Sequence, residues 1–275
     1  MRIWLHPERM AQYGLVPSDV TAVLGPYLAS KQEYTFVSRV LRVSKLGESM
    51  TEHLLRDLID SQTNPTIATY VKNIEVVVRI TAKAKSESEA NKLIDPVASK
   101  VYERLGNNVY AEGETTISEV VCRMLMEKKI TVAVSESCTG GLLSAAFTDI
   151  PGISEVFAEG AVTYSNEAKM RRLGVKSETL EKYGAVSAQT AAEMAEGIAK
   201  TAGTDIGLST TGIAGPGGGT EEKPVGLVYI GLCVKGRTVT KELHFTGNRE
   251  KIRVRTVDAV FDALRRELEN MEQNS

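Results

Sequence analysis

The sequence predicts an α/β protein in which a small α+β domain precedes a three-layer α/β/α domain. Two observations support this prediction. Residues 33–112 follow the order strand, helix, two strands, helix, whereas strands and helices alternate along the remaining 160 or so residues. A chain of 275 residues, of which 42% are hydrophobic, is long enough to bury two cores. We place the domains at residues 29–114 and 115–275, after a short unassigned segment at residues 1–28.

The small domain is expected to contain a sheet covered by helices. Strand patterns occupy residues 34–43, 66–71 and 74–84, and helical patterns occupy residues 47–62 and 86–106. Ser86 or Ser88 can cap the second helix, and Gly106 can end it. The alternation in EVVVRITAKA predicts a sheet with one face toward the helices and the other toward water or a neighbour.

The second domain is expected to be a sheet between two layers of helices, with an antiparallel pair of strands near its end. Helical patterns fall at residues 117–129, 139–150, 166–174, 187–203 and 248–271. Strand patterns fall at residues 130–135, 156–165, 205–212, 223–234 and 239–246.

The stretch SESCTGGLLSAAF, residues 135–147, places polar residues and two glycines between a buried strand and a helix. Such a turn exposes backbone N–H groups and hydroxyls at the positive end of a helix, where an anion can be held or a nucleophile activated. Ser137 is the candidate nucleophile, and the N–H groups of Cys138, Thr139 and Gly140 can stabilise an oxyanion. The alternative is a well-capped helix, with Ser137 as the cap and Glu136 as a partner of the helix dipole.

Two further polar clusters, YSNEAK and TTGIAGPGGGTEEKP, also follow predicted strands. Because ligands of open α/β sheets bind beyond the carboxyl ends of the strands, we expect the three clusters to converge. Taken alone, Lys169 reads as a solvated helix lysine, Tyr164 as a packing residue and the glycine cluster as a flexible turn.

Composition excludes several classes of protein. The net charge of −2 and pI near 6.1 do not favour nucleic acid or an anionic membrane as a partner, and no apolar stretch reaches membrane-spanning length. The start, MRIWLHPERM, lacks the apolar core of a signal peptide. Three separated cysteines and three unpaired histidines argue against a disulfide framework or a metal site. We therefore expect a cytoplasmic protein that needs neither metal nor cofactor.

Several motifs, in this order, resemble the C-terminal domain of the CinA family of competence/damage-inducible proteins: SESCTGG, TYSNEAK, YGAVS, TGIAGPGGGTEEKPVG and FTGNRE. This resemblance covers residues 117–269. Upstream, SRVLRVSKLGES, LIDSQTNPTIATYVKNIEVVVRITAKA and NVYAEGE are similar to the central KH-like domain of longer CinA proteins. The middle region has no G-x-x-G motif, so RNA binding is not inferred.

The resemblance implies deamidation of nicotinamide mononucleotide to nicotinate mononucleotide and ammonia, a step of pyridine nucleotide salvage. It implies Lys169 as the base that activates Ser137, through an acyl-enzyme, whereas activation of water by Lys169 is the other route. Tyr164 and Thr211 are expected to orient the base or bind the carboxamide and ribose. Cys138 is the rival nucleophile. The expected substrate-binding residues are Glu136, Cys138, Thr139, Gly140, Asn166, Gly212, Gly215, Gly217, Gly218, Lys223 and Arg249.

Two other functions remain open at this point. A nucleotide-binding scaffold would use the same glycine loops without hydrolysis, and it would tolerate loss of Ser137 and Lys169. A hydrolase of another small amide would keep these two residues without requiring a phosphate loop.

The beginning of the chain departs from the family pattern. Long CinA proteins carry a molybdopterin-binding-like domain associated with ADP-ribose pyrophosphatase activity, and about 25 residues cannot fold such a domain, so we expect that activity to be absent. The segment MRIWLHPERMAQYGLVPSDVTAVL resembles a strand-turn-helix piece from the periplasmic part of RND-type efflux pumps. The alternating sheet face of the middle domain and the apolar VDAVFDAL segment predict a homodimer.

Overall fold

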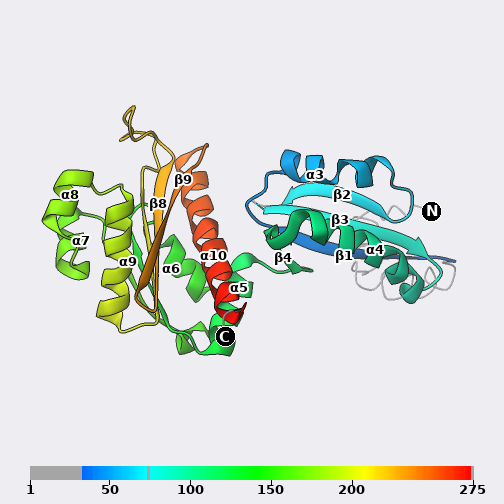
Figure 1. Ribbon diagram of the computed structural model, residues 1–275, viewed down its shortest axis with the longest axis horizontal. Coiled ribbons are helices and arrows are strands. Elements are labelled where there is room, and N and C mark those ends of the chain that lie inside the picture. The colour runs from blue at the N-terminus through cyan, green and yellow to red at the C-terminus, as the bar shows by residue number, and fades with distance from the viewer. Residues whose placement is uncertain (1–32, 73–74, 274–275) are drawn as a thin grey trace, which may run out of the picture. The chain divides into compact units, whose positions relative to one another are not determined.

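The computed structural model describes residues 33–72 and 75–273, which form two compact units (Figure 1). The first unit contains residues 33–41, Gly47–Val71 and Val76–Val109. The second contains Arg42–Leu46, Lys72, Glu75 and the chain from Tyr110 onward. The predicted strand-turn-helix at the start of the chain lies outside the described residues.

A four-stranded sheet in the order β2-β3-β1-β4 organises the small α+β part, and helices α3 and α4 contact each other beside it (Figure 1). Its elements are β1 (Thr35–Val43), α3 (Glu48–Asp60), β2 (Thr66–Lys72), β3 (Glu75–Ala84), α4 (Glu87–Leu105) and β4 (Val109–Glu112). Ser86 rather than Ser88 caps α4, because its side chain accepts a hydrogen bond from the N–H of Glu89 at 3.2 Å. Gly106 ends α4 as predicted.

A five-stranded sheet in the order β6-β5-β7-β8-β9 forms the centre of the second unit. Strand β5 (Val132–Glu136) lies parallel to β6 (Phe157–Val162) on one side and to β7 (Ile206–Gly212) on the other. Strands β8 (Leu227–Val234) and β9 (Arg237–His244) then continue the sheet antiparallel. The predicted mixture of alternating elements and a terminal antiparallel pair is confirmed.

Helices cover both faces of this sheet, which confirms the predicted three-layer architecture (Figure 1). One layer consists of α5 (Ile117–Lys128), α6 (Leu142–Thr148) and α10 (Arg249–Gln273). In the other, α7 (Asn166–Leu173) and α8 (Ser177–Tyr183) pack against α9 (Ala188–Ala202). Successive side chains of strand β5 point into apolar clusters on opposite faces of the sheet. Val132 and Val134 pack in the cluster beneath α5, α6 and α10, whereas Ala133 packs with Met194 of α9.

Helix α9 lies unusually close to the sheet because the strands present small residues to it. The Ser135 hydroxyl donates to the carbonyl of Met194 at 3.2 Å, and the Ser209 hydroxyl donates to the carbonyl of Ala191 at 2.6 Å. At Gly231 of β8, a Cβ atom would lie 2.4 Å from the same Ala191 oxygen. A larger residue there would push the helix from the strands.

We therefore expect Gly231→Ala to lower the free energy of unfolding by about 1–3 kcal/mol, the usual cost of overpacking a close contact. The added methyl would meet the Ala191 carbonyl and the Ser209 hydroxyl, and neither can move without breaking its hydrogen bond to the other. Urea denaturation measures the effect. Gly217→Ala is the control for the loss of a glycine, because nothing lies within 4 Å of its Cβ position and its φ angle is not positive. Equal stability of the Gly231 variant and the wild type would contradict this packing.

Four details differ from the sequence-based expectations. Helix α8 and strand β4 were not anticipated. Helix α6 begins at Leu142 rather than at residue 139, because Gly140 and Gly141 have φ angles of +56° and +97°. The apolar side chains of the VDAVFDAL segment in α10, including Val260 and Phe261, are buried in the core of their own unit. That segment no longer argues for a partner chain, and the homodimer stays a prediction.

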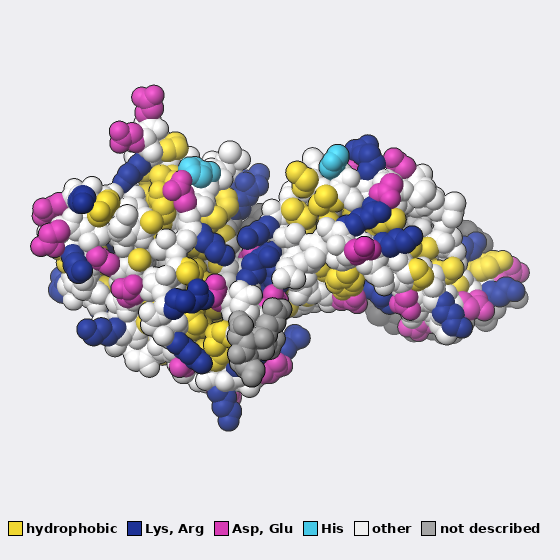
Figure 2. Space-filling view, in the orientation of Figure 1, with side chains coloured by type: hydrophobic (Ala, Val, Ile, Leu, Met, Phe, Trp, Pro, Cys, Tyr) yellow, Lys and Arg dark blue, Asp and Glu magenta, His cyan; other side chains and the backbone are white. Residues whose placement is uncertain are grey.

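The surface carries interspersed acidic and basic side chains on the face in view of each unit (Figure 2). This mixture agrees with the small net charge of −2. Across the described part of the chain, no helix combines the length and the apolar character that crossing a bilayer requires.

Candidate functional site

Ser137 lies where strand β5 ends, between the ends of its two parallel neighbours, β6 and β7. Its backbone N–H donates to the carbonyl of Thr210 in β7 at 3.0 Å. On the other side, the N–H of Thr163, just beyond β6, donates to the carbonyl of Glu136 at 2.9 Å. These two hydrogen bonds extend the sheet ladder by one residue and fix the backbone of Ser137. The carboxyl ends of the strands thus meet at this residue, as the sequence predicts.

Lys169 reaches Ser137 from the first turn of α7. The side chain of Ser165 caps this helix by accepting the N–H of Ala168 at 3.1 Å, which sets the turn that carries Lys169. Lys169 is 1% exposed, and its Nζ lies 3.2 Å from the Ser137 Oγ. Burial lowers the pKa of Lys169 below the ordinary lysine value. The predicted pair of Ser137 and Lys169 is therefore in contact.

The remaining partners of the Lys169 amine are two backbone carbonyls, those of Thr163 at 2.9 Å and Tyr164 at 3.1 Å. Carbonyl oxygens only accept hydrogen bonds. In the neutral amine, the two N–H groups can satisfy these two carbonyls, which leaves the nitrogen lone pair for the Ser137 hydroxyl proton. In the ammonium form, the third N–H donates to the Ser137 Oγ instead. The same geometry therefore accommodates the proton before and after its transfer.

The carboxylate of Glu136 is fully buried and anchors the start of α6. Its Oε2 accepts the N–H groups of Gly141 at 2.9 Å and Leu143 at 3.0 Å. Its Oε1 accepts the N–H of Ser144 at 2.8 Å and the Ser144 hydroxyl at 2.6 Å. Glu136 was predicted to bind substrate, but its four hydrogen bonds are all made to this helix. The structure therefore gives it the role of the helix-dipole partner.

Three successive backbone N–H groups, those of Cys138, Thr139 and Gly140, donate to no backbone carbonyl within the described residues, although those of Cys138 and Thr139 lie near the Cys138 sulfur. Backbone donors left unpaired in a protein usually face water or a ligand. Here they follow Ser137 directly, and Gly140 is exposed. Consecutive N–H groups of this kind form an anion-binding concavity. The Gly140 N–H is thus open to a ligand, and the role of the three groups as oxyanion donors stays a prediction.

Cys138 is a poor nucleophile in this setting. It is 6% exposed, and burial raises the pKa of its thiol to about 12. The reactive thiolate is therefore scarce at neutral pH. This environment favours Ser137 over Cys138 in the choice that the sequence left open.

Other predicted residues take structural contacts. The hydroxyl of Thr211 donates to the carbonyl of Ala185 at 2.7 Å, and Thr139 shares a 2.7 Å hydrogen bond with Thr210. Tyr164 touches the Lys169 amine through its carbonyl, while its side chain is 62% exposed. Asn166 is exposed in the first turn of α7. The Tyr164 ring and Asn166 thus remain open to a ligand, whereas the hydroxyls of Thr139 and Thr211 are occupied.

The glycine-rich loop follows β7, and part of it is open. A Cβ at Gly217 would meet nothing within 4 Å, and one at Gly218 only Ile213 at 3.9 Å. Gly212 and Gly215 are tightly enclosed, because a Cβ at either would lie 2.6 Å from a valine side chain. The exposed part of the loop therefore leaves space for a ligand, and the enclosed part holds the loop to the sheet.

The two predicted cations hold backbone carbonyls. The Lys223 Nζ donates to those of Tyr183 at 2.6 Å and Val186 at 2.8 Å. The Nη1 of Arg249 donates to the carbonyl of Gly215 at 2.9 Å. In the described part of the chain, Arg249 forms no ion pair with a carboxylate, and the Gly215 carbonyl uses only its Nη1.

Arg253, one helical turn after Arg249, was missed by the sequence analysis. Its Nε and Nη2 donate to the carbonyl of Thr139 at 3.2 and 2.5 Å. The two residues are 114 positions apart, so no local pattern connects them. The only available signal was the Arg249/Arg253 spacing, which places both side chains on one face of a helix.

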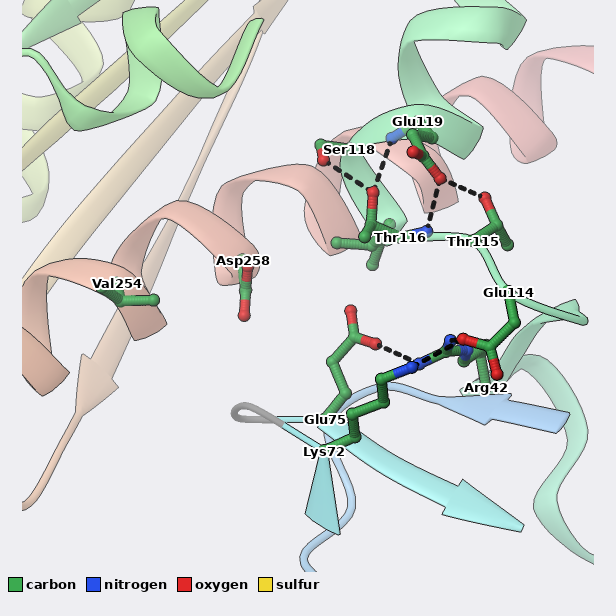
Figure 3. A pocket seen from close by; sticks show the side chains of 11 residues that line it. Arg42, Lys72, Glu75, Glu114, Thr115, Thr116, Ser118, Glu119, Val254 and Asp258 are labelled. Atoms are coloured by element: carbon green, nitrogen blue, oxygen red, sulfur yellow. Dashed lines mark hydrogen bonds and ion pairs between the residues drawn. The ribbon is translucent and has the colours of Figure 1, made fainter. Parts of the chain in front are cut away.

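A separate cavity of about 410 Å³ lies in the second unit (Figure 3). Within it, the Glu75 carboxylate accepts a hydrogen bond from the Tyr110 hydroxyl at 2.7 Å. Burial, helped by the charge of Glu75, raises the pKa of Asp258 to about 7. The lining residues are Arg42, Lys72, Glu75, Glu114, Thr115, Thr116, Ile117, Ser118, Glu119, Val254 and Asp258. None of the predicted site residues is among them.

Comparison with protein families finds two matching models. The CinA C-terminal domain matches residues 114–268, which include every predicted site residue. The KH domain of the damage-inducible protein CinA matches residues 38–111. Together the two models cover most of the described chain.

Relatives and solved structures agree with this assignment. Putative competence-damage inducible proteins from Clostridium acetobutylicum and Clostridium perfringens are 64% and 59% identical over 246 and 247 residues. Each alignment covers 90% of this chain, which spans about 60% of the length of those relatives.

Two crystal structures each cover 56% of this chain. A CinA superfamily protein from Klebsiella pneumoniae is 35% identical with a TM-score of 0.55, and 96% of it is covered. A competence/damage inducible protein from Agrobacterium tumefaciens is 40% identical with a TM-score of 0.53, and 97% of it is covered. The chain carrying this serine–lysine site belongs to the CinA family of competence/damage-inducible proteins.

Proposed function

We propose that the chain is an amidohydrolase that converts nicotinamide mononucleotide to nicotinate mononucleotide and ammonia. The observation that carries this proposal is the contact of the buried Lys169 amine with the Ser137 hydroxyl at 3.2 Å. A buried lysine with a lowered pKa can accept the proton of a serine, and two backbone carbonyls hold it in place. The resemblance to the CinA family supplies the expected substrate.

The reaction proceeds in two halves. The Ser137 Oγ attacks the carboxamide carbon while its proton passes to Lys169, and the oxyanion is stabilised by the N–H groups that follow Ser137. When the oxyanion collapses, the C–N bond breaks, and the leaving ammonia takes the proton from Lys169. Water, deprotonated by Lys169, then attacks the acyl ester and releases the nicotinate product. The proton it gave up returns to the Ser137 Oγ.

The surroundings supply features that suit a mononucleotide. The backbone carbonyl of Tyr164 contacts Lys169, and its exposed ring offers an aromatic face for a pyridine ring. The open positions at Gly217 and Gly218 and the guanidinium of Arg249 suit a ribose phosphate. The single amine of Lys223 donates to two backbone carbonyls, whereas Arg249 uses only its Nη1 on the Gly215 carbonyl, so Arg249 is the better candidate for the phosphate.

Ammonia release tests the proposal, with nicotinamide mononucleotide, nicotinamide riboside and nicotinamide compared as substrates. We expect rapid release from the mononucleotide and slow or no release from the other two, because these lack the phosphate. Release from the smaller amides alone would indicate a different amidohydrolase. Binding of the mononucleotide without any release would indicate a scaffold, and both results would overturn the proposal.

The pH dependence of kcat/KM should follow the neutral form of Lys169. Because burial lowers its pKa, the activity should rise about tenfold per pH unit and then level off at a midpoint below the ordinary lysine value of 10.5. Steady-state rates between about pH 5 and pH 10 measure this. A rate that falls as pH increases through this range would show that the ammonium is the active form and would contradict a general-base role.

A further inference from the structure

The Thr139–Gly140 peptide carries one of the N–H groups beside Ser137, and Arg253 holds its carbonyl. The guanidinium makes two hydrogen bonds to this single oxygen, from Nε at 3.2 Å and from Nη2 at 2.5 Å. The N–H of Leu142 donates to the same oxygen at 3.3 Å. A forked guanidinium usually engages a carboxylate. Within the described residues Arg253 has no carboxylate partner, so its charge is directed at this one peptide.

The orientation of this peptide determines where the Gly140 N–H points. The bond is trans, so the Thr139 oxygen and the Gly140 hydrogen lie on opposite sides of it. With the oxygen held toward α10, the N–H faces away from that helix, and it has no hydrogen-bond partner in the described part of the chain. It is therefore free to donate to an anion.

The local sequence alone does not select this orientation. Gly140 and Gly141 have φ angles of +56° and +97°, and glycine passes between left-handed and right-handed regions at little steric cost. A peptide followed by two glycines can therefore rotate until its carbonyl replaces its N–H. The buried Thr139 side chain, bonded to Thr210 at 2.7 Å, fixes the residue before the peptide but not the peptide itself.

We infer that Arg253 is a positioning residue that locks the Thr139–Gly140 peptide with the Gly140 N–H turned toward the oxyanion of the Ser137 reaction. This inference rests on the proposed amide hydrolysis. The positive charge at the carbonyl also polarises the peptide, which strengthens the N–H as a donor. Arg253 itself does not touch the substrate, so its loss should lower kcat and leave KM nearly unchanged.

The test compares Arg253→Ala with Arg255→Ala. Arg255 is a matched control because it lies on the same helix and also donates to a backbone carbonyl, that of Thr246 at 3.1 Å. Losing one oxyanion donor costs about 10²–10³-fold in kcat, so we expect a fall of about this size for Arg253→Ala and almost none for Arg255→Ala. Arg253→Lys should recover part of the rate, and added guanidinium should partly rescue Arg253→Ala. A purely structural role would not be rescued in this way.

A second readout separates this inference from the proposed function. A fluorophosphonate reacts with an activated serine, and its phosphoryl oxygen occupies the oxyanion position without any amide substrate. Labelling of Ser137 should be at least about tenfold slower in Arg253→Ala than in the wild type and unchanged in Arg255→Ala. Normal labelling and normal kcat in Arg253→Ala would refute the positioning role of Arg253 without contradicting the proposed amidohydrolase activity. If the wild-type protein is labelled but releases no ammonia, only the proposed deamidase activity is refuted. If it shows neither labelling nor ammonia release, the deamidase activity and the role of Arg253 are both refuted.

Discussion

Ser137→Ala is expected to reduce kcat for ammonia release by at least about 10³-fold, because it removes the atom that attacks the amide. Lys169→Met should be nearly as damaging, since the side chain keeps its size but can no longer accept the serine proton. The double variant should be little worse than either single variant, because the two groups act in one proton transfer across the 3.2 Å contact. Steady-state ammonia release from all three variants measures this non-additivity.

The control for this result is Cys138→Ala, which alters the neighbouring residue and removes a thiol that burial keeps protonated. It should retain most of the activity. If instead Ser137→Ala kept substantial turnover while Lys169→Met lost it, Lys169 would be activating water directly. If Cys138→Ala alone abolished turnover with folding intact, the thiol would be the nucleophile.

The second large effect concerns stability. Glu136→Ala should lower the free energy of unfolding by about 3–5 kcal/mol, because four donors at the start of α6 lose their buried acceptor together. Charge-assisted hydrogen bonds at a helix N-terminus are among the stronger ones, and the replacement offers neither an acceptor nor a charge. Urea denaturation followed by circular dichroism measures the change.

Ser144→Ala is the matched control, because it removes only the hydroxyl contact to Glu136 and leaves the three backbone donors paired. Its cost should be about 1 kcal/mol. A Glu136→Ala protein as stable as the wild type would show that these hydrogen bonds contribute nothing beyond what water supplies to the exposed helix end.

Regular elements were predictable from the sequence where their hydrophobic pattern was long or their ends were capped. Helix α9 is an example, since Ser187 caps it by accepting the N–H of Thr190 at 3.2 Å and Gly203 ends it. Helix α8 was not predicted because it has seven residues and no side-chain cap at Lys176. Strand β4, with four residues, is also too short for its alternation to stand out.

Within the site, the chemistry of neighbouring residues was predictable, whereas contacts between distant segments were not. The strand-to-helix turn at Ser137 identified its own hydroxyl and N–H groups. By contrast, the sequence did not show that Lys223 and Arg249 also donate to backbone carbonyls. The contacts of Glu136 were not predictable either, because only the three-dimensional position of α6 shows that both carboxylate oxygens accept hydrogen bonds from the start of this helix. Arg253 depends entirely on where α10 is placed.

The contact between Arg253 and Thr139 also has a consequence for the order of events during biosynthesis. The chain emerges from the ribosome from its N-terminus, so the nucleophile and the base leave the exit tunnel well before α10. Until α10 docks, the Thr139 carbonyl lacks its guanidinium, and Phe147 lacks the ring of Phe261, whose centroid packs 4.8 Å from its own. A nascent chain thus holds Ser137 and Lys169 before the contacts made by α10 exist. On the proposed mechanism, the site is completed only after α10 has docked.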